Sequence, residues 1–91
     1  MTRLYPNYPN PFNPETTIQY SIKSAGWVDI SIYNISGQLI RVLKRSNENS
    51  GTHSMLWNGR DNNNQAVASG VYYVRMNTSD GVSIVKMTLM K

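Results

Sequence analysis

The sequence predicts an all-β domain in which two sheets pack as a sandwich. Apolar and polar residues alternate with a period of two in several segments, as in strands that have one buried and one solvated face. Helical periodicity is nearly absent. Clusters of Gly, Asn, Asp and Ser separate the alternating segments at intervals of roughly ten residues, a spacing typical of sandwiches with six or seven strands. The 91 residues suffice for one domain and leave no room for a second core.

The first fifteen residues are dominated by Pro9, Pro11 and Pro14. Each proline lacks a backbone N–H and restricts the residue before it to extended geometry, so a helix is excluded here. We therefore expect residues 1–15 to form an extended, proline-rich lead-in and residues 16–91 to form the sandwich. Because a rigid lead-in is followed by strands up to the last residue, we expect a module appended to the end of another protein.

The strands can be placed in order along the chain. Alternation predicts strands at 17–23, 27–34, 52–57, 70–78 and 82–90. Residues 38–45 are apolar but irregular, and the pattern leaves a strand and a short helix open. Residues 66–68 could add a short edge strand, and the polar segments 46–51 and 58–65 are predicted to be loops. Trp57 and Tyr72 are expected at the centre of the core.

Composition narrows the possible functions. The chain has no cysteine, which excludes disulfides and thiolate metal sites. Its net charge of +4 is spread along the chain, whereas nucleic-acid binding usually needs a stripe of charge, so no nucleic-acid partner is expected. No apolar run reaches the length of a membrane span, and membrane insertion is not expected.

Residue types with catalytic or metal-binding potential are few. His53 is the single histidine, and we interpret it as a strand residue packed beside Met55 and Trp57 rather than as a base or metal ligand. Asp61 begins an Asp-Asn-Asn-Asn run that fits a hairpin turn better than a calcium loop, which needs more carboxylates. There is no carboxylate pair, nucleophile motif or phosphate loop, so we expect no enzyme activity, cofactor or metal.

Two aromatic residues, Trp27 and Tyr33, fall on the outward face of their predicted strand. They would lie about 20 Å apart along it. At this separation the two rings could bind an oligosaccharide, cover a neighbouring domain, or be surface aromatics without a ligand.

Five segments carry a family resemblance. They are NYPNPFNPETTI at 7–18, VDISIYNISG at 28–37, GTHSMLWNGRD at 51–61, VASGVYYVRM at 67–76 and KMTLMK at 86–91. In this order and spacing they resemble the type A C-terminal sorting domain of the type IX secretion system, found at the ends of secreted proteins in the Bacteroidetes and related bacteria. The pattern is also similar to the immunoglobulin-like domain of the flagellar hook-capping protein.

The resemblance implies an immunoglobulin-like antiparallel β-sandwich of about seven strands that acts as an export address. The partners would be the type IX secretion translocon, a surface sortase and an N-terminal passenger. The passenger would reach the outer cell surface, or be secreted, by way of the periplasm. Matching the family's motifs by position implies these recognition residues: Gly70, Val71, Tyr72, Lys86, Met87, Leu89 and Lys91.

Other functions stay open at this point. The last strand could offer its edge to a partner by β-augmentation, or let two copies associate, and Lys86 and Lys91 would discourage indiscriminate pairing. A second hypothesis is an accessory sandwich of a secreted glycoside hydrolase that binds polysaccharide or acts as a spacer. A third is a structural module of a flagellar or filament assembly.

Overall fold

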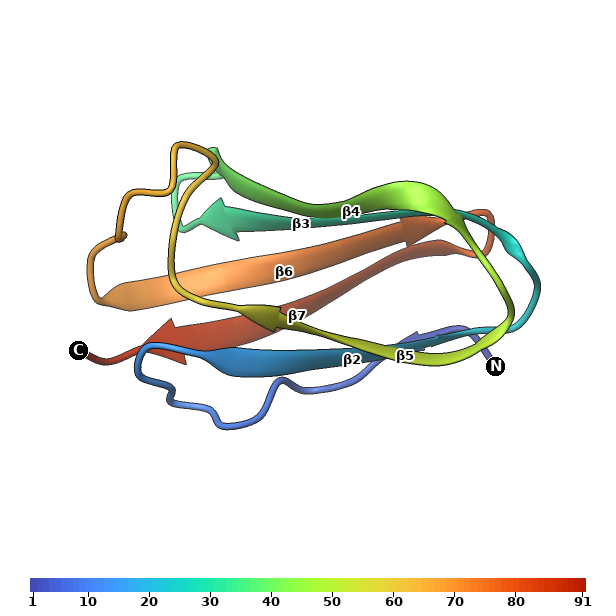
Figure 1. Cartoon of the computed structure of the whole chain (residues 1–91), viewed down its shortest axis with the longest axis horizontal. Coiled ribbons are helices and arrows are strands. Elements are labelled where there is room, and N and C mark those ends of the chain that lie inside the picture. Colours follow the sequence, from blue (N-terminus) through green and yellow to red (C-terminus); the bar gives the residue numbers. More distant parts are fainter.

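The computed structural model describes residues 1–91 as seven strands in two antiparallel sheets that face each other (Figure 1). The all-β sandwich predicted from the sequence is thus confirmed. The strands are β1 (Arg3–Leu4), β2 (Thr16–Ile22), β3 (Gly26–Asn34), β4 (Leu39–Glu48), β5 (Gly51–Trp57), β6 (Gly70–Thr78) and β7 (Gly81–Leu89). No helix long and apolar enough to cross a bilayer is present.

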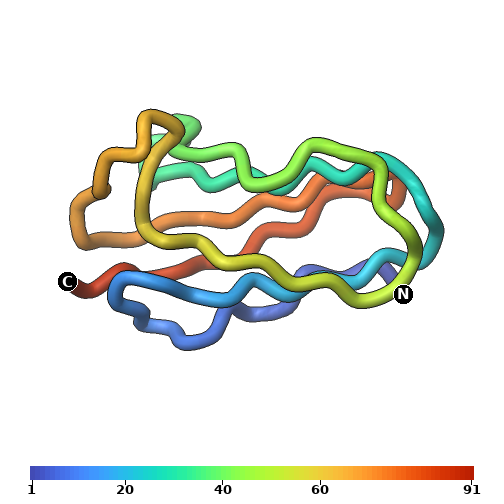
Figure 2. The backbone as a smooth tube through the Cα atoms, in the orientation of Figure 1, coloured from blue at the N-terminus to red at the C-terminus, as the bar shows by residue number.

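The smaller sheet has the order β1-β2-β5 and the larger one β4-β3-β6-β7. The chain passes between the layers from β2 to β3 and from β4 to β5 at one end, and from β5 to β6 at the other (Figure 2). The last strand, β7, therefore forms an edge of the larger sheet. Its inner neighbour β6 pairs with it along its whole length, from Gly70↔Leu89 to Thr78↔Gly81.

Two local predictions are corrected. The ambiguous apolar segment is strand β4, and it continues to Glu48 through residues predicted to be loop. Pairing with β3 explains the extension, because Gly26 lies opposite Glu48 and carries the ladder to that point. The proposed edge strand at 66–68 is reduced to an isolated bridge between Arg60 and Ala66.

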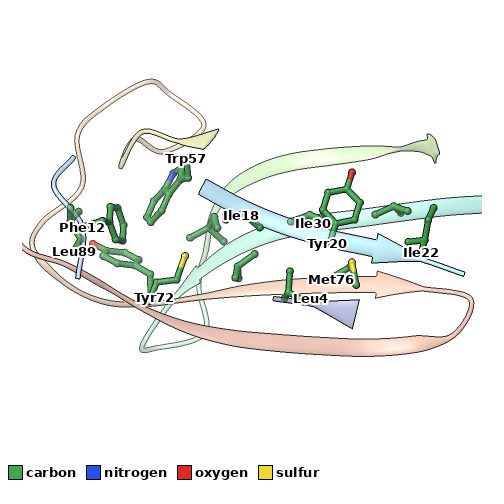
Figure 3. Packing of buried hydrophobic residues seen from close by; sticks show 14 residues of the cluster. Leu4, Phe12, Ile18, Tyr20, Ile22, Ile30, Trp57, Tyr72, Met76 and Leu89 are labelled. Atoms are coloured by element: carbon green, nitrogen blue, oxygen red, sulfur yellow. The ribbon is translucent and has the colours of Figure 1, made fainter. Parts of the chain in front are cut away.

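The core contains fourteen buried apolar residues, and three of its aromatic members, Phe12, Trp57 and Tyr72, gather at one end, whereas Tyr20 lies toward the other (Figure 3). Trp57 and Tyr72 are buried as predicted, at 1% and 7% exposed, but they lie at one end of the core rather than at its centre. Their rings meet edge to face with centroids 5.3 Å apart, and the ring of Phe12 lies 5.6 Å from that of Trp57. Aromatic contacts of this kind add to the gain from burial alone. The lead-in thus contributes directly to the core, through Phe12 and through Leu4 of β1.

A polar cluster joins β4 of one sheet to β2 and β5 of the other. The Tyr20 hydroxyl donates to Glu48 Oε1 at 3.1 Å, and Lys44 Nζ lies 3.2 Å from the same oxygen. Burial, followed by the contact with Glu48, raises the pKa of Tyr20 to about 12. The hydrogen bond from Lys44 lowers the pKa of Glu48. His53 stacks on the Tyr20 ring at 5.2 Å, and its Nε2 lies 2.7 Å from Asn49 O.

Candidate recognition surface

The seven predicted recognition residues come together at one end of the sandwich. Gly70 lies opposite Leu89, Val71 opposite Thr88, and Tyr72 opposite Met87 in the β6–β7 ladder. Lys86 precedes Met87 on β7. The Lys91 N–H donates to Ser69 Oγ at 3.0 Å, which places the end of the chain beside the start of β6.

Burial divides these residues into two groups. Tyr72, Met87 and Leu89 face the core and are 7%, 0% and 1% exposed. Tyr72 is further held by the bond that its hydroxyl donates to Ala68 O at 2.6 Å, and burial raises its pKa. A folded partner can therefore reach Lys86 and Lys91, which are exposed, and the half-buried Gly70 and Val71. The three buried residues hold the strands that present the others.

Gly70 begins β6 with φ of +155°, at the limit of the region that favours glycine. No atom lies within 4 Å of the place that a Cβ would occupy. The backbone conformation, rather than crowding, therefore favours glycine at this position.

The edge of β7 near its C-terminal end is already covered. The Phe12 N–H donates to Thr88 O at 3.0 Å, and the Met90 N–H donates to Phe12 O at 2.9 Å. Asn10 adds two side-chain bonds, since its Oδ1 accepts from the Thr88 N–H at 3.0 Å and its Nδ2 donates to Lys86 O at 3.4 Å. These four bonds occupy part of the edge that was predicted to bind a partner by β-augmentation.

Asn10 and Phe12 were thus missed as parts of this surface. Phe12 is the only phenylalanine and sits among prolines in a polar segment, which is a signal for a buried anchor. A further contact holds the same segment, because buried Asn7 donates from Nδ2 to Thr16 Oγ1 at 2.9 Å. Thr16 in turn donates to Pro9 O at 2.9 Å.

The outward face of β3 carries Trp27 and Tyr33, as predicted. Trp27 is 54% exposed and Tyr33 is half-buried. Between them, Asp29 accepts from Ser31 Oγ at 2.8 Å and pairs with Arg45 Nε at 3.1 Å. Polysaccharide binding by these two aromatic residues stays a prediction.

The Asp61 loop has the geometry of a turn. Asp61 Oδ1 accepts from the backbone N–H groups of Asn63 and Gln65 at 2.9 and 3.0 Å. This carboxylate oxygen satisfies local backbone donors, as in an Asx turn. No cluster of three or more potential metal-ligating side chains is present.

The sequence matches a family model, the FlgD Ig-like domain, over residues 13–81. The chain therefore belongs to this family. The match confirms the immunoglobulin-like character of the sandwich. No curated protein matches the sequence.

Three solved structures share the fold. PorZ of Porphyromonas gingivalis, described as an essential surface component of the type IX secretion system, aligns with a TM-score of 0.64 and 23% identity. Dimeric latent PorU of the same organism aligns with a TM-score of 0.72 and 18% identity. FlgD of Xanthomonas campestris, described in connection with hook capping, aligns with a TM-score of 0.60 and 21% identity.

The alignments differ in how much of each protein they cover. They include 97%, 99% and 96% of this chain but 11%, 9% and 65% of the PorZ, PorU and FlgD chains. The Ig-like domain thus corresponds to a small part of the first two proteins.

Proposed function

We propose that this Ig-like domain is a non-catalytic sorting domain that directs an attached passenger across the outer membrane through the type IX secretion system. The passenger would then be secreted or retained at the outer cell surface. The partners are the translocon, a surface sortase and the passenger itself. The sequence motifs that resemble type A sorting domains support the proposal, and so does the similarity to a domain-sized part of PorZ.

The observation that carries the proposal is the arrangement of the terminal strand. Lys86 and Lys91 are exposed, whereas Met87 and Leu89 between them are buried. Alternation along β7 therefore separates Met87 and Leu89, which anchor the strand, from Lys86, which a receptor can contact, and Lys91 lies beyond the end of the strand. Neither lysine makes an ion pair within the chain, so both charges are free for an acidic receptor.

A fusion experiment tests this proposal. The chain is attached to the C-terminus of a fluorescent periplasmic cargo in a bacterium that has the type IX system, and surface fluorescence is measured. We expect surface display with the native chain. Removing residues 86–91 would be uninformative, because it also removes Met87 and Leu89 from the core. The informative variant is the double substitution Lys86→Gln and Lys91→Gln.

We expect the double variant to fold normally and to leave the cargo in the periplasm. The control is Lys23→Gln, which removes another exposed positive charge far from β7 in the sequence. Full surface display by the double variant would refute recognition through these lysines. Failure of the native chain to display cargo would refute the sorting function.

The family match favours a second candidate, a structural module of a flagellar or filament assembly. FlgD of X. campestris shares the fold over 96% of this chain. Replacing the matching domain of that protein by this chain and scoring hook assembly would test the candidate. Restored hooks would favour the structural role over sorting.

A further inference from the structure

The outer edge of β7 is open over its first half. Thr88 and Lys86 direct backbone groups away from β6, since these groups bond to Asn10 and Phe12. Backbone direction alternates along an antiparallel strand, so Ile84 and Val82 point their N–H and C=O groups the same way. No hydrogen bond is made to these groups from the lead-in or any other segment.

A shallow groove lies on the outer face of the larger sheet, next to this open edge. Its volume is about 590 Å³, and it is lined mainly by apolar and aromatic side chains around one arginine. The side chains that matter here are Tyr33, Ile35, Tyr73, Arg75, Val82 and Ile84. Val82 and Ile84 are 50% and 60% exposed. Proteins usually protect a free edge with charge, proline or a bulge, but residues 81–85 contain neither charge nor proline.

Two positive charges, those of Arg75 and Lys86, border the groove. Arg75 lies opposite Ile84 in the ladder, is exposed, and has no hydrogen-bond or ion-pair partner in the chain. Lys86 follows on β7, opposite Tyr73. The acid on this face, Asp29, is already engaged by Ser31 and Arg45. The surface therefore complements a negatively charged partner.

We propose that the open half of β7 binds an extended peptide segment as an added strand. Its backbone would pair with Val82 and Ile84. Every second side chain of the added strand would lie on the outer face. Among these, apolar groups would contact Val82 and Ile84, and acidic groups would lie toward Arg75 and Lys86. This inference goes beyond the sorting function and does not depend on it.

A second copy of the chain fits this surface less well than an acidic peptide. Two β7 edges paired about a twofold axis would bring Arg75 and Lys86 of both copies onto one face, and like charges placed close together oppose pairing. An acidic strand instead supplies the charge that the groove lacks. Apolar contact is common to both partners, so the charge decides between them.

Two blocked peptides of the same length provide the probe, one repeating Val-Thr-Glu-Thr and the other Val-Thr-Lys-Thr, so that Val and the charged residue share one face of the added strand. Binding to the full chain is measured by calorimetry, and the site is located by amide chemical shifts. We expect the Glu peptide to bind and to shift the amides of residues 82–86. We expect Arg75→Gln to weaken binding about fivefold or more, as for loss of a charge-assisted contact.

Matched variants separate the edge from general surface effects. Ile84→Pro removes the outward N–H and is expected to abolish binding without breaking the β6 ladder. Ile84→Asp should also weaken binding, because it removes an apolar contact and repels an acidic strand, whereas Leu56→Asp should not, although Leu56 is similarly exposed at 62%. Lys23→Gln controls for net charge.

Several results would overturn the proposal. Equal binding of the Lys peptide would remove the charge argument. Amide shifts confined to β4, the opposite edge of the sheet, would place the site elsewhere. Dimerisation through β7 without peptide would assign the edge to a second copy, and binding of oligosaccharide at Tyr33 and Tyr73 with no effect of the peptide would assign the groove to sugar.

Discussion

The two halves of β7 belong to one strand and pair with the same neighbour, but their outer edges differ. From Lys86 to Met90 the lead-in covers the edge with four hydrogen bonds. From Gly81 to Val85 the edge is free and carries exposed apolar side chains. The comparison indicates that this domain protects half of its last strand by a tertiary contact rather than by charge or proline.

The lead-in can cover this edge because Phe12 anchors it. Its ring is 2% exposed and packs against Trp57, so the Phe12 backbone is held beside Leu89. Pro11 has no N–H to donate, and the Asn10 side chain supplies the neighbouring bonds instead. Along the open half, β1 of the other sheet lies near β7, but no residue of the lead-in forms a hydrogen bond with the edge. Four predictions test this difference, from the largest expected effect to the smallest.

Phe12→Ala should lower the free energy of unfolding by about 3 kcal/mol, as truncation of a buried aromatic side chain does. Loss of the anchor should also speed amide exchange at Thr88 and Met90 and leave Ile84 unchanged. Urea denaturation and hydrogen exchange measure the two effects. Tyr8→Ala is the control, since Tyr8 lies in the same lead-in but is 79% exposed. Unchanged exchange at Met90 would show that the ring does not hold the edge.

Alkaline pH should lower the free energy of unfolding. The folded state holds the Tyr20 proton more tightly than the unfolded chain, so stability is complete below pH 10 and falls as the pH rises toward about 12. The raised pKa of Tyr72 adds to this in the same direction. We expect a loss on the order of 1–2 kcal/mol across this window.

Tyr20→Phe should remove part of the pH dependence, and Tyr8→Phe should leave it intact. Denaturation curves recorded at several values between pH 9 and 12 measure the slope. Because Tyr72 lies beside the covered half of β7, the protection factor of Thr88, corrected for the base catalysis of exchange, should decrease in the same window. A free energy of unfolding that does not change between pH 9 and 12 would contradict a stabilising role for the protonated Tyr20 hydroxyl.

Asn10→Ala should cost about 1 kcal/mol, the usual net value of a hydrogen-bonding side chain that satisfies backbone groups. Exchange at Thr88 should increase more than at Met90, because Asn10 Oδ1 accepts from the Thr88 N–H. Asn13→Ala provides the control, since Asn13 is exposed. Equal effects from the two variants would mean that the Asn10 bonds do not protect the edge.

Ile84→Lys should change the free energy of unfolding by less than about 0.5 kcal/mol, as expected for an exposed position. Its effect should be on association instead, because a charge on the free edge opposes edge-to-edge pairing. Sedimentation at high concentration compares it with Leu56→Lys. A large loss of stability would show that the open half is supported by contacts that Ile84 makes within the fold.

Much of the fold follows from local pattern. The strand at 70–78 was predicted with the bounds that the structure has, because Tyr72, Val74 and Met76 alternate with polar or half-exposed neighbours. The C-terminal end of β4 was not predicted, because Ser46 and Asn47 are residue types that are common in loops. Their strand geometry comes from pairing with Val28 and Trp27. A local pattern contains no information about such a partner.

The candidate site was predicted in a similar way. The seven residues that the motifs single out lie together at one end of the sandwich, and their role in recognition stays a prediction. The motifs did not separate exposed Lys86 from buried Met87. They also missed Asn10, which lies 78 residues from its partner Thr88 in the sequence. The groove combines side chains from β3, β6 and β7, so no single segment indicated it.

The sequence by itself determined which segments become strands and which side of each strand is buried, because side-chain direction alternates along any extended backbone. Only the tertiary structure decided which edge of the last strand is covered. That outcome depends on where a buried ring carries the lead-in. Every residue other than proline offers the same backbone donor and acceptor, so the sequence does not show which distant segments will pair.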